Sequence, residues 1–101
     1  MALAEIKRLV AEGKYRYSYN VRTFIEEGFF GEEDLVQCIL SARRIFKRER
    51  DELKQAKHGM KYVILGRDTY GRPFYTVGKI LSAPQDRVYF YITAHQADEE
   101  P

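Results

Sequence analysis

Residues 61–95 read KYVILGRDTYGRPFYTVGKILSAPQDRVYFYITAH and contain three runs rich in the β-branched and aromatic residues that favour strands. The runs cover 61–67, 72–81 and 87–95, and two short segments with the composition of turns, DTYG and SAPQD, separate them. Pro73 fits this interpretation because proline is tolerated at the start of a strand. Short connections join antiparallel neighbours, so the sequence predicts an antiparallel meander.

The alternation of residue types along the third run predicts which of its faces is buried. The even-numbered residues are apolar, and we expect them to face the core: Val88, Phe90, Ile92 and Ala94. The odd-numbered residues carry two phenols, a hydroxyl and an imidazole, and we expect them to face away from the core: Tyr89, Tyr91, Thr93 and His95. This second face is either the wet side of an ordinary sheet or the floor of a site.

The first part of the chain has the spacing of three amphipathic helices. Apolar residues recur at helical intervals before Gly13, again over about 19–27, and again after Gly31. Ser18 is placed to cap the second helix, and Gly28 to end it. The order of helices first and strands later predicts an α+β fold.

We therefore expect one domain over residues 1–101, with N-terminal helices packed on one face of a curved three- to four-stranded antiparallel sheet. The helical part covers about 2–43, the sheet part about 44–96, and an acidic tail 97–101. Within the sheet part we expect a strand near 44–49, followed by a solvated helical turn or loop.

The composition excludes several classes of protein. The net charge is +2, although residues 43–58 hold seven Lys or Arg and three acids. Cys38 is the one cysteine, so no internal disulfide forms and a structural zinc site is not expected. No apolar run reaches the length of a membrane span, and the N-terminal residues do not form a signal peptide. We expect a cytoplasmic protein with no cofactor or metal and no membrane association.

The order of several blocks resembles a known family. The blocks are YSYNVRTFIEEGFFGEEDLVQCIL (17–40), YVILGRDTYGRPFYTVGKI (62–80) and RVYFYITAHQAD (87–98). They resemble the "domain of unknown function 4258" family, and the resemblance covers roughly residues 15–98. It implies the barnase, EndoU, colicin and RelE type of fold, in which helices precede a curved antiparallel sheet. Relatives with that fold include metal-independent ribonucleases, many of them bacterial toxins paired with antitoxins.

The resemblance holds at some positions and fails at others. The family's histidine at the start of the second helix corresponds to Tyr19, and the arginine of its next turn to Glu27. Thr93 matches, and His95 takes the place of a terminal aromatic residue. The end of the first strand and the turn that follows it match as written: Gly66, Arg67, Gly71, Arg72 and Pro73.

Metal-free RNA cleavage needs a group that takes a proton from the 2′-hydroxyl, a cation for the phosphorane charge and an acid for the leaving oxygen. Histidine serves either proton transfer, arginine presents a planar fork to phosphate, and tyrosine stacks on exposed bases. With the resemblance, this predicts a catalytic group of His95, Arg67 and Arg72. It also predicts substrate contacts by Tyr19, Tyr91 and Thr93.

Each of these residues also has an ordinary structural explanation. The odd-numbered face of the last strand suits the exposed side of any sheet, and arginines beside a hairpin turn also serve solubility. The alternative to a ribonuclease is a non-catalytic module that binds RNA or protein, with the fold of the family but without its chemistry. The expected partners are RNA, an antitoxin-like protein and a second copy of the chain that holds the acidic tail.

Overall fold

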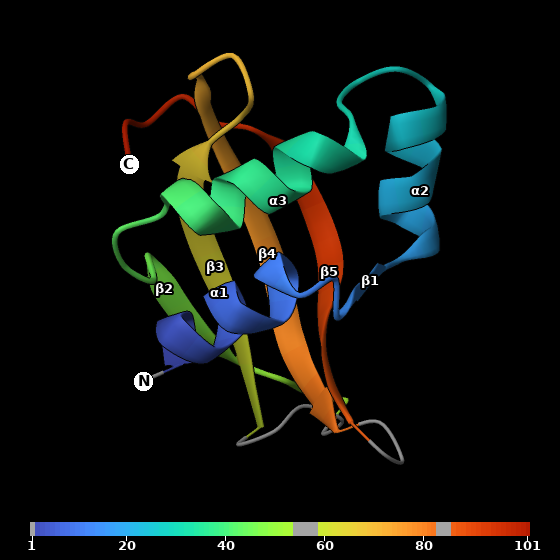
Figure 1. The fold of residues 1–101 in the computed structure, drawn as a ribbon, viewed down its shortest axis with the longest axis vertical. Helices are drawn as coiled ribbons and strands as arrows, with labels where there is room; N and C mark the ends of the chain where they lie inside the picture. Colours follow the sequence, from blue (N-terminus) through green and yellow to red (C-terminus); the bar gives the residue numbers. More distant parts are fainter. Residues whose placement is uncertain (1, 54–58, 83–85) are drawn as a thin grey trace.

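The computed structural model describes residues 2–53, 59–82 and 86–101. Within these ranges the chain forms three helices and five strands, so the predicted α+β class is confirmed (Figure 1). In chain order the elements are α1 (Ala2–Ala11), β1 (Tyr15–Tyr17), α2 (Tyr19–Glu26), α3 (Glu32–Ser41), β2 (Lys47–Arg50), β3 (Met60–Arg67), β4 (Pro73–Ser82) and β5 (Arg87–Gln96).

Two of the sequence predictions fall largely on residues outside these ranges. The turn expected at 82–86 includes 83–85, and the helical turn or loop expected after 49 includes 54–58 with His58. Among the described residues, no helix is long and apolar enough to cross a membrane.

The strands form one mixed sheet in the order β1-β5-β4-β3-β2. Strands β2 to β5 pair antiparallel, whereas β1 runs parallel to β5. The predicted sheet of three to four antiparallel strands is therefore wrong, because β1 adds a fifth strand with the opposite kind of pairing. With three residues, β1 is too short for periodicity to reveal it. Its pairing is extended by the N–H of Tyr89, which donates to the carbonyl of Lys14 at 3.0 Å.

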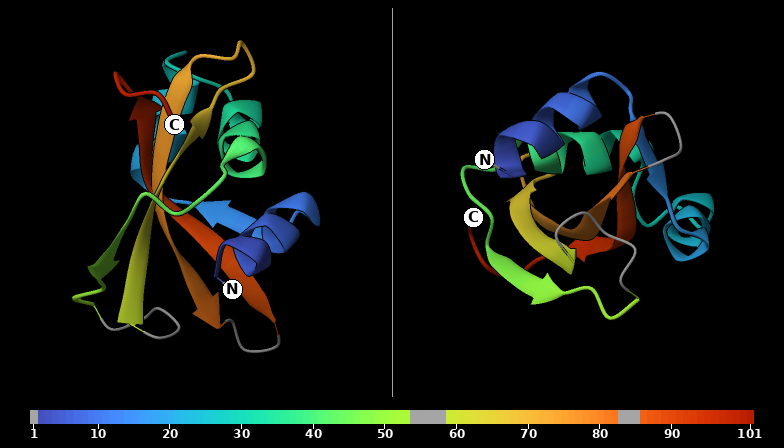
Figure 2. Two further views of the ribbon diagram at one scale, coloured as in Figure 1. Left: turned by 90° about the vertical axis from the view of Figure 1, so that its left-hand side faces the viewer. Right: turned by 90° about the horizontal axis from the view of Figure 1, so that it is seen from below.

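Two of the three described helices lie on one side of this sheet. Helices α1 and α3 cover the same face, and the opposite face has no described helix on it (Figure 2). Helix α2 packs beside β5 at the sheet edge. Ser18 caps α2 as predicted: its Oγ accepts a hydrogen bond from the N–H of Val21 at 3.1 Å and donates one to the carbonyl of Ile92 at 2.8 Å. The Ser18 side chain thus caps the start of α2 and joins this helix to β5.

A glycine lets α3 lie directly on β3. A Cβ atom at Gly66 would stand 2.1 Å from the carbonyl oxygen of Cys38, so no larger residue fits between helix and strand. Cys38 is fully buried at this contact, as its position on the inner side of the helix requires. Gly66 therefore has a packing function.

The buried face of β5 is the opposite of the predicted one. Tyr89 and Tyr91 have no exposed surface, whereas Val88, Phe90 and Ile92 are only partly buried. Two features of β4 and β5 explain the error. Gly78 leaves the space that the Tyr89 ring fills, because a Cβ there would stand 2.4 Å from the Tyr89 hydroxyl.

The second feature is a bulge in β5. Val77 pairs with Thr93 while Gly78 pairs with Tyr91, so Ile92 is an extra residue between the two pairs. The bulge shifts the alternation by one residue. Beyond it, Ala94 faces the core and is fully buried, which agrees with the sequence prediction for that residue. Thr93 and His95 remain on the open face, opposite Val77 and Tyr75.

Candidate functional site

The face of the sheet away from α1 and α3 is hollowed by a cavity of about 440 Å³, which we call the open-face groove. Apolar side chains of β3 and β4 form its floor, and polar side chains of β2, β5 and the segment after β5 form its walls. The lining residues are Phe46, Lys47, Glu49, Val63, Leu65, Tyr75, Val77, His95, Gln96, Ala97, Asp98 and Glu99.

His95 and Tyr75 form a pair on one wall of this groove. They are directly opposite each other in the β4–β5 register, and their ring centroids lie 4.0 Å apart at 73°. The Tyr75 hydroxyl is hydrogen-bonded to Nε2 of His95. Both side chains line the groove, so a bound ligand can reach the two groups together.

The hydrogen bonds of His95 indicate which ring nitrogen carries the proton when the imidazole is neutral. Nδ1 lies 2.9 Å from the carbonyl oxygen of Gln96, which can only accept, so Nδ1 carries the proton. Nε2 then has the free lone pair and accepts the proton of the Tyr75 hydroxyl. This arrangement presents a proton acceptor and a proton donor side by side at the groove wall.

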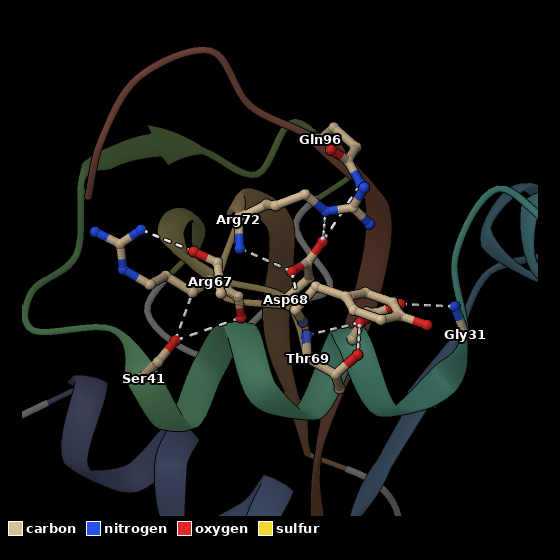
Figure 3. A network of polar contacts seen from close by, with 10 residues as sticks. Gly31, Ser41, Arg67, Asp68, Thr69, Arg72 and Gln96 are labelled. Carbon is tan, nitrogen blue, oxygen red and sulfur yellow. Dashed lines mark hydrogen bonds and ion pairs between the residues drawn. The ribbon is translucent and has the colours of Figure 1, made fainter.

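Arg67 lies at the end of β3 and is held by two contacts. Its Nη1 donates to the carbonyl of Gly71 at 3.0 Å, and its Nη2 lies 2.7 Å from a carboxylate oxygen of Glu100. The backbone N–H of Arg67 donates to Oγ of Ser41 at 2.9 Å, which fixes the strand end to α3 (Figure 3). The guanidinium is therefore oriented towards the segment that follows β5.

Arg72 belongs to a network that holds the β3–β4 turn. Its Nε lies 3.0 Å from Oδ2 of Asp68, whose side chain is buried. Oδ1 of Asp68 also accepts the backbone N–H of Tyr70 and that of Arg72, and Oδ2 accepts from the amide of Gln96 at 3.3 Å (Figure 3). Arg72 thus compensates the charge of a buried carboxylate, which is a structural task at this position.

The predicted substrate contacts are not gathered in one place. Tyr19 is 82% exposed at the first residue of α2, and Thr93 is half-buried on the open face opposite Val77. The prediction for Tyr91 is corrected: this residue is fully buried, and its hydroxyl donates to the carbonyl of Leu35 at 3.0 Å. Burial raises the pKa of Tyr91 well above its ordinary value. Its hydroxyl is therefore part of the α3–β5 packing.

Several groove residues were missed by the sequence interpretation. Tyr75 lies twenty residues before His95, and only the register of the β4–β5 hairpin places the two side by side. Phe46 and Lys47 come from the basic run 43–58, in which no site residue was identified from the sequence. The guanidinium of Arg44 lies 5.8 Å from the centre of the Phe46 ring, so this run brings positive charge to the groove.

A smaller cavity of about 220 Å³ lies beside the groove. Its walls are aromatic side chains of α2 and the loop that follows, including Phe24 and the 64% exposed Phe29, together with residues of β5. His95 and Gln96 line both cavities, so they form the ridge between them. A ligand bound at His95 has an aromatic surface within reach on its other side.

No group of three or more His, Cys, Asp or Glu side chains in residues 2–53, 59–82 and 86–101 is arranged to hold a metal ion. Comparisons of the chain with protein-family models, with curated proteins and with solved structures gave no match, so the family resemblance stays a prediction.

Proposed function

We propose that this chain is a small endoribonuclease that binds single-stranded RNA in the open-face groove and cleaves it at His95. The proposal depends on one observation, the hydrogen-bonded pair of His95 and Tyr75 on the groove wall. Proton transfer is the chemistry that such a pair supplies, and cleavage of RNA at its own 2′-hydroxyl requires only proton transfers and charge stabilisation.

The lining of the groove suits a single strand of RNA. Bases stack on aromatic and flat side chains while cations follow the phosphates, and this combination is tolerant of sequence. Phe46 and Tyr75 supply aromatic surface, and Lys47, whose Nζ lies 3.3 Å from a carboxylate oxygen of Glu49, supplies a cation to the same groove. The guanidinium of Arg44 lies over the Phe46 ring and adds positive charge beside it.

The reaction can be written with the groups on the wall. On RNA binding the Tyr75 hydroxyl turns from Nε2 of His95 to the leaving 5′-oxygen. Nε2 then accepts the proton of the ribose 2′-hydroxyl, and the 2′-oxygen forms a bond to the adjacent phosphorus. The bond from phosphorus to the 5′-oxygen breaks, and this oxygen takes the proton of the Tyr75 hydroxyl. The protonated His95 then returns a proton to Tyr75. The products are a 2′,3′-cyclic phosphate and a 5′-hydroxyl, and both side chains regain their initial state.

The second candidate is an RNA-binding module without cleavage. It is favoured by the ion pairs of the two predicted catalytic arginines, since Arg67 is paired with Glu100 and Arg72 with Asp68. A phosphorane needs a cation that is free to approach it. In this alternative the groove binds RNA, but no cation completes the catalytic group.

An RNA cleavage assay separates the two. A single-stranded oligoribonucleotide is incubated with the purified protein, with and without EDTA, and the products are identified by mass spectrometry. We expect a cyclic phosphate product in both conditions. Loss of the proton acceptor in His95→Ala, or of the donor in Tyr75→Phe, should lower the rate at least ~100-fold.

The matched control is Gln37→Ala, an exposed side chain of α3 on the other side of the sheet, which should leave the rate unchanged. Cleavage by His95→Ala at the wild-type rate would remove His95 from the mechanism. Salt-dependent RNA binding by wild type without any cleavage would establish the second candidate instead.

A further inference from the structure

The segment after β5 turns back over the sheet. The N–H of Ala97 donates to the carbonyl of Pro73 at 3.1 Å, which continues the β4–β5 pairing by one residue. From there the chain crosses the end of the sheet towards the β3 side (Figure 1). Asp98 and Glu99 line the open-face groove, and Glu100 reaches Arg67. Three consecutive carboxylates are thus brought to the place where the proposed RNA phosphates would bind.

The contact of Glu100 with Arg67 has the form of a phosphate contact. The Gly71 carbonyl fixes one side of the guanidinium at 3.0 Å, and the carboxylate lies 2.7 Å from the other terminal nitrogen. Carboxylate and phosphate present similar oxygens to the planar fork of arginine, and both bind it by charge-assisted hydrogen bonds. The Glu100 carboxylate therefore occupies the position that a phosphate oxygen would take on Arg67.

We propose that the acidic segment Asp98–Glu100 is an internal competitor of RNA, which lines the groove and holds Arg67 until RNA phosphates displace it. The inference rests on the proposed RNA-binding function and adds its regulation. It also explains how Arg67, which does not itself line the groove, can be paired in the free protein and still bind RNA. Displacement of Glu100 frees the guanidinium for a phosphate of the bound strand.

The ion pair between Arg67 and Glu100 is weak enough for RNA to displace the carboxylate. The Arg67 and Glu100 side chains are 41% and 71% exposed, and exposed ion pairs are weak and sensitive to salt. The segment is tethered directly to the end of β5, so its effective concentration at the groove is high. A strand of RNA with several phosphates can therefore displace it, whereas a single phosphate competes poorly.

The test compares two variants with the same change in net charge. Glu99→Gln/Glu100→Gln neutralises the competitor, and Glu26→Gln/Glu27→Gln neutralises two exposed acids at the end of α2. The probe is a fluorescein-labelled 2′-O-methyl oligouridylate, which lacks the nucleophilic hydroxyl and so reports binding alone. At low salt we expect the first variant to bind about threefold to tenfold more tightly than the second. The difference should shrink near ~0.5 M NaCl, where exposed charges are screened.

A third variant, Arg67→Gln, tests the contact itself. In this background the additional change Glu100→Gln should no longer tighten binding, because the carboxylate has lost its partner. Equal affinities of the two charge-matched variants, with RNA binding by wild type, would overturn the competitor and leave the proposed function standing. Failure of every variant to bind the oligouridylate would overturn both.

Discussion

Tyr89 and Tyr91 lie two residues apart on β5 and have no exposed surface, yet their hydroxyl groups are in different situations. The Tyr91 hydroxyl donates to the carbonyl of Leu35 at 3.0 Å. The Tyr89 hydroxyl lies against Gly78 and makes no hydrogen bond of good geometry with the described residues, although the Thr76 side chain lies close enough to affect its pKa. A buried polar group without a partner loses its hydration and gains nothing in return.

The two tyrosines therefore make a matched pair for mutation. Tyr89→Phe removes an unpaired hydroxyl and should leave the free energy of unfolding unchanged or raise it by up to about 1 kcal/mol. Tyr91→Phe removes a hydrogen bond and should lower it by about 1 kcal/mol. Urea unfolding followed by circular dichroism measures both. A clear loss of stability in Tyr89→Phe would mean that its hydroxyl has a partner.

The candidate site also shows what single residues reveal before a structure is known. His95 was identified from the sequence because an imidazole at a strand end is a chemically distinctive residue. Tyr75 was not, because a phenol in the middle of a strand is common and its meaning depends on the residue across the ladder. The ion pairs of Arg67 and Arg72 with Glu100 and Asp68 depend in the same way on how the chain folds back.

At the scale of elements, the packing of α3 on β3 depends on a single glycine. In Gly66→Ala the new methyl group would meet the Cys38 carbonyl at 2.1 Å, so α3 must move away from the sheet. We expect the free energy of unfolding to fall by about 3 kcal/mol, near the upper end of ordinary single substitutions. Thermal and urea unfolding provide the measurement.

Gly31→Ala is the control for this substitution. A Cβ there meets only the end of the Glu33 side chain, which can turn away, and the glycine has a negative φ of −108°. Because Gly31 is the N-cap of α3, where alanine is less favourable than glycine, the change should lower the free energy of unfolding by about 1 kcal/mol, well short of the effect at position 66. If the two alanine variants were equally stable, the close contact of helix and strand would not be what constrains position 66.

The elements themselves were largely predictable, whereas the faces of β5 were not. Helix spacing and Ser18 located α2, and strand composition located β3, β4 and β5, because these signals are local. β5 is apolar enough on both sides that alternation alone allows either side to be buried. Which face of β5 is buried depends on Gly78 in the neighbouring strand and on the bulge at Ile92. Both are properties of the pair of strands.

At the scale of the molecule, the helices cover one face of the sheet and leave the other to the groove (Figure 2). The buried side holds several groups that must keep their protons in the folded chain. Burial raises the pKa of the Cys38 thiol to about 12, and burial together with Glu32 raises that of Tyr15 to about 12. Burial also raises the pKa values of Tyr89 and Tyr91.

These raised pKa values predict that the folded state becomes less stable at alkaline pH. The unfolded chain loses the Cys38 proton near pH 9.0 and the tyrosine protons near pH 10.0, while the folded chain keeps them to about 12. Above pH 9 the folded state therefore binds more protons than the unfolded state, and the free energy of unfolding must fall as the pH rises. Urea unfolding at several values between pH 7 and pH 11 measures the fall. In Cys38→Ala the free energy of unfolding should fall less between pH 9 and pH 10, because the missing thiol is the first of these groups to titrate in the unfolded chain. Stability that stays constant to pH 11 in the wild-type chain would show that these side chains are not buried together beneath the helices.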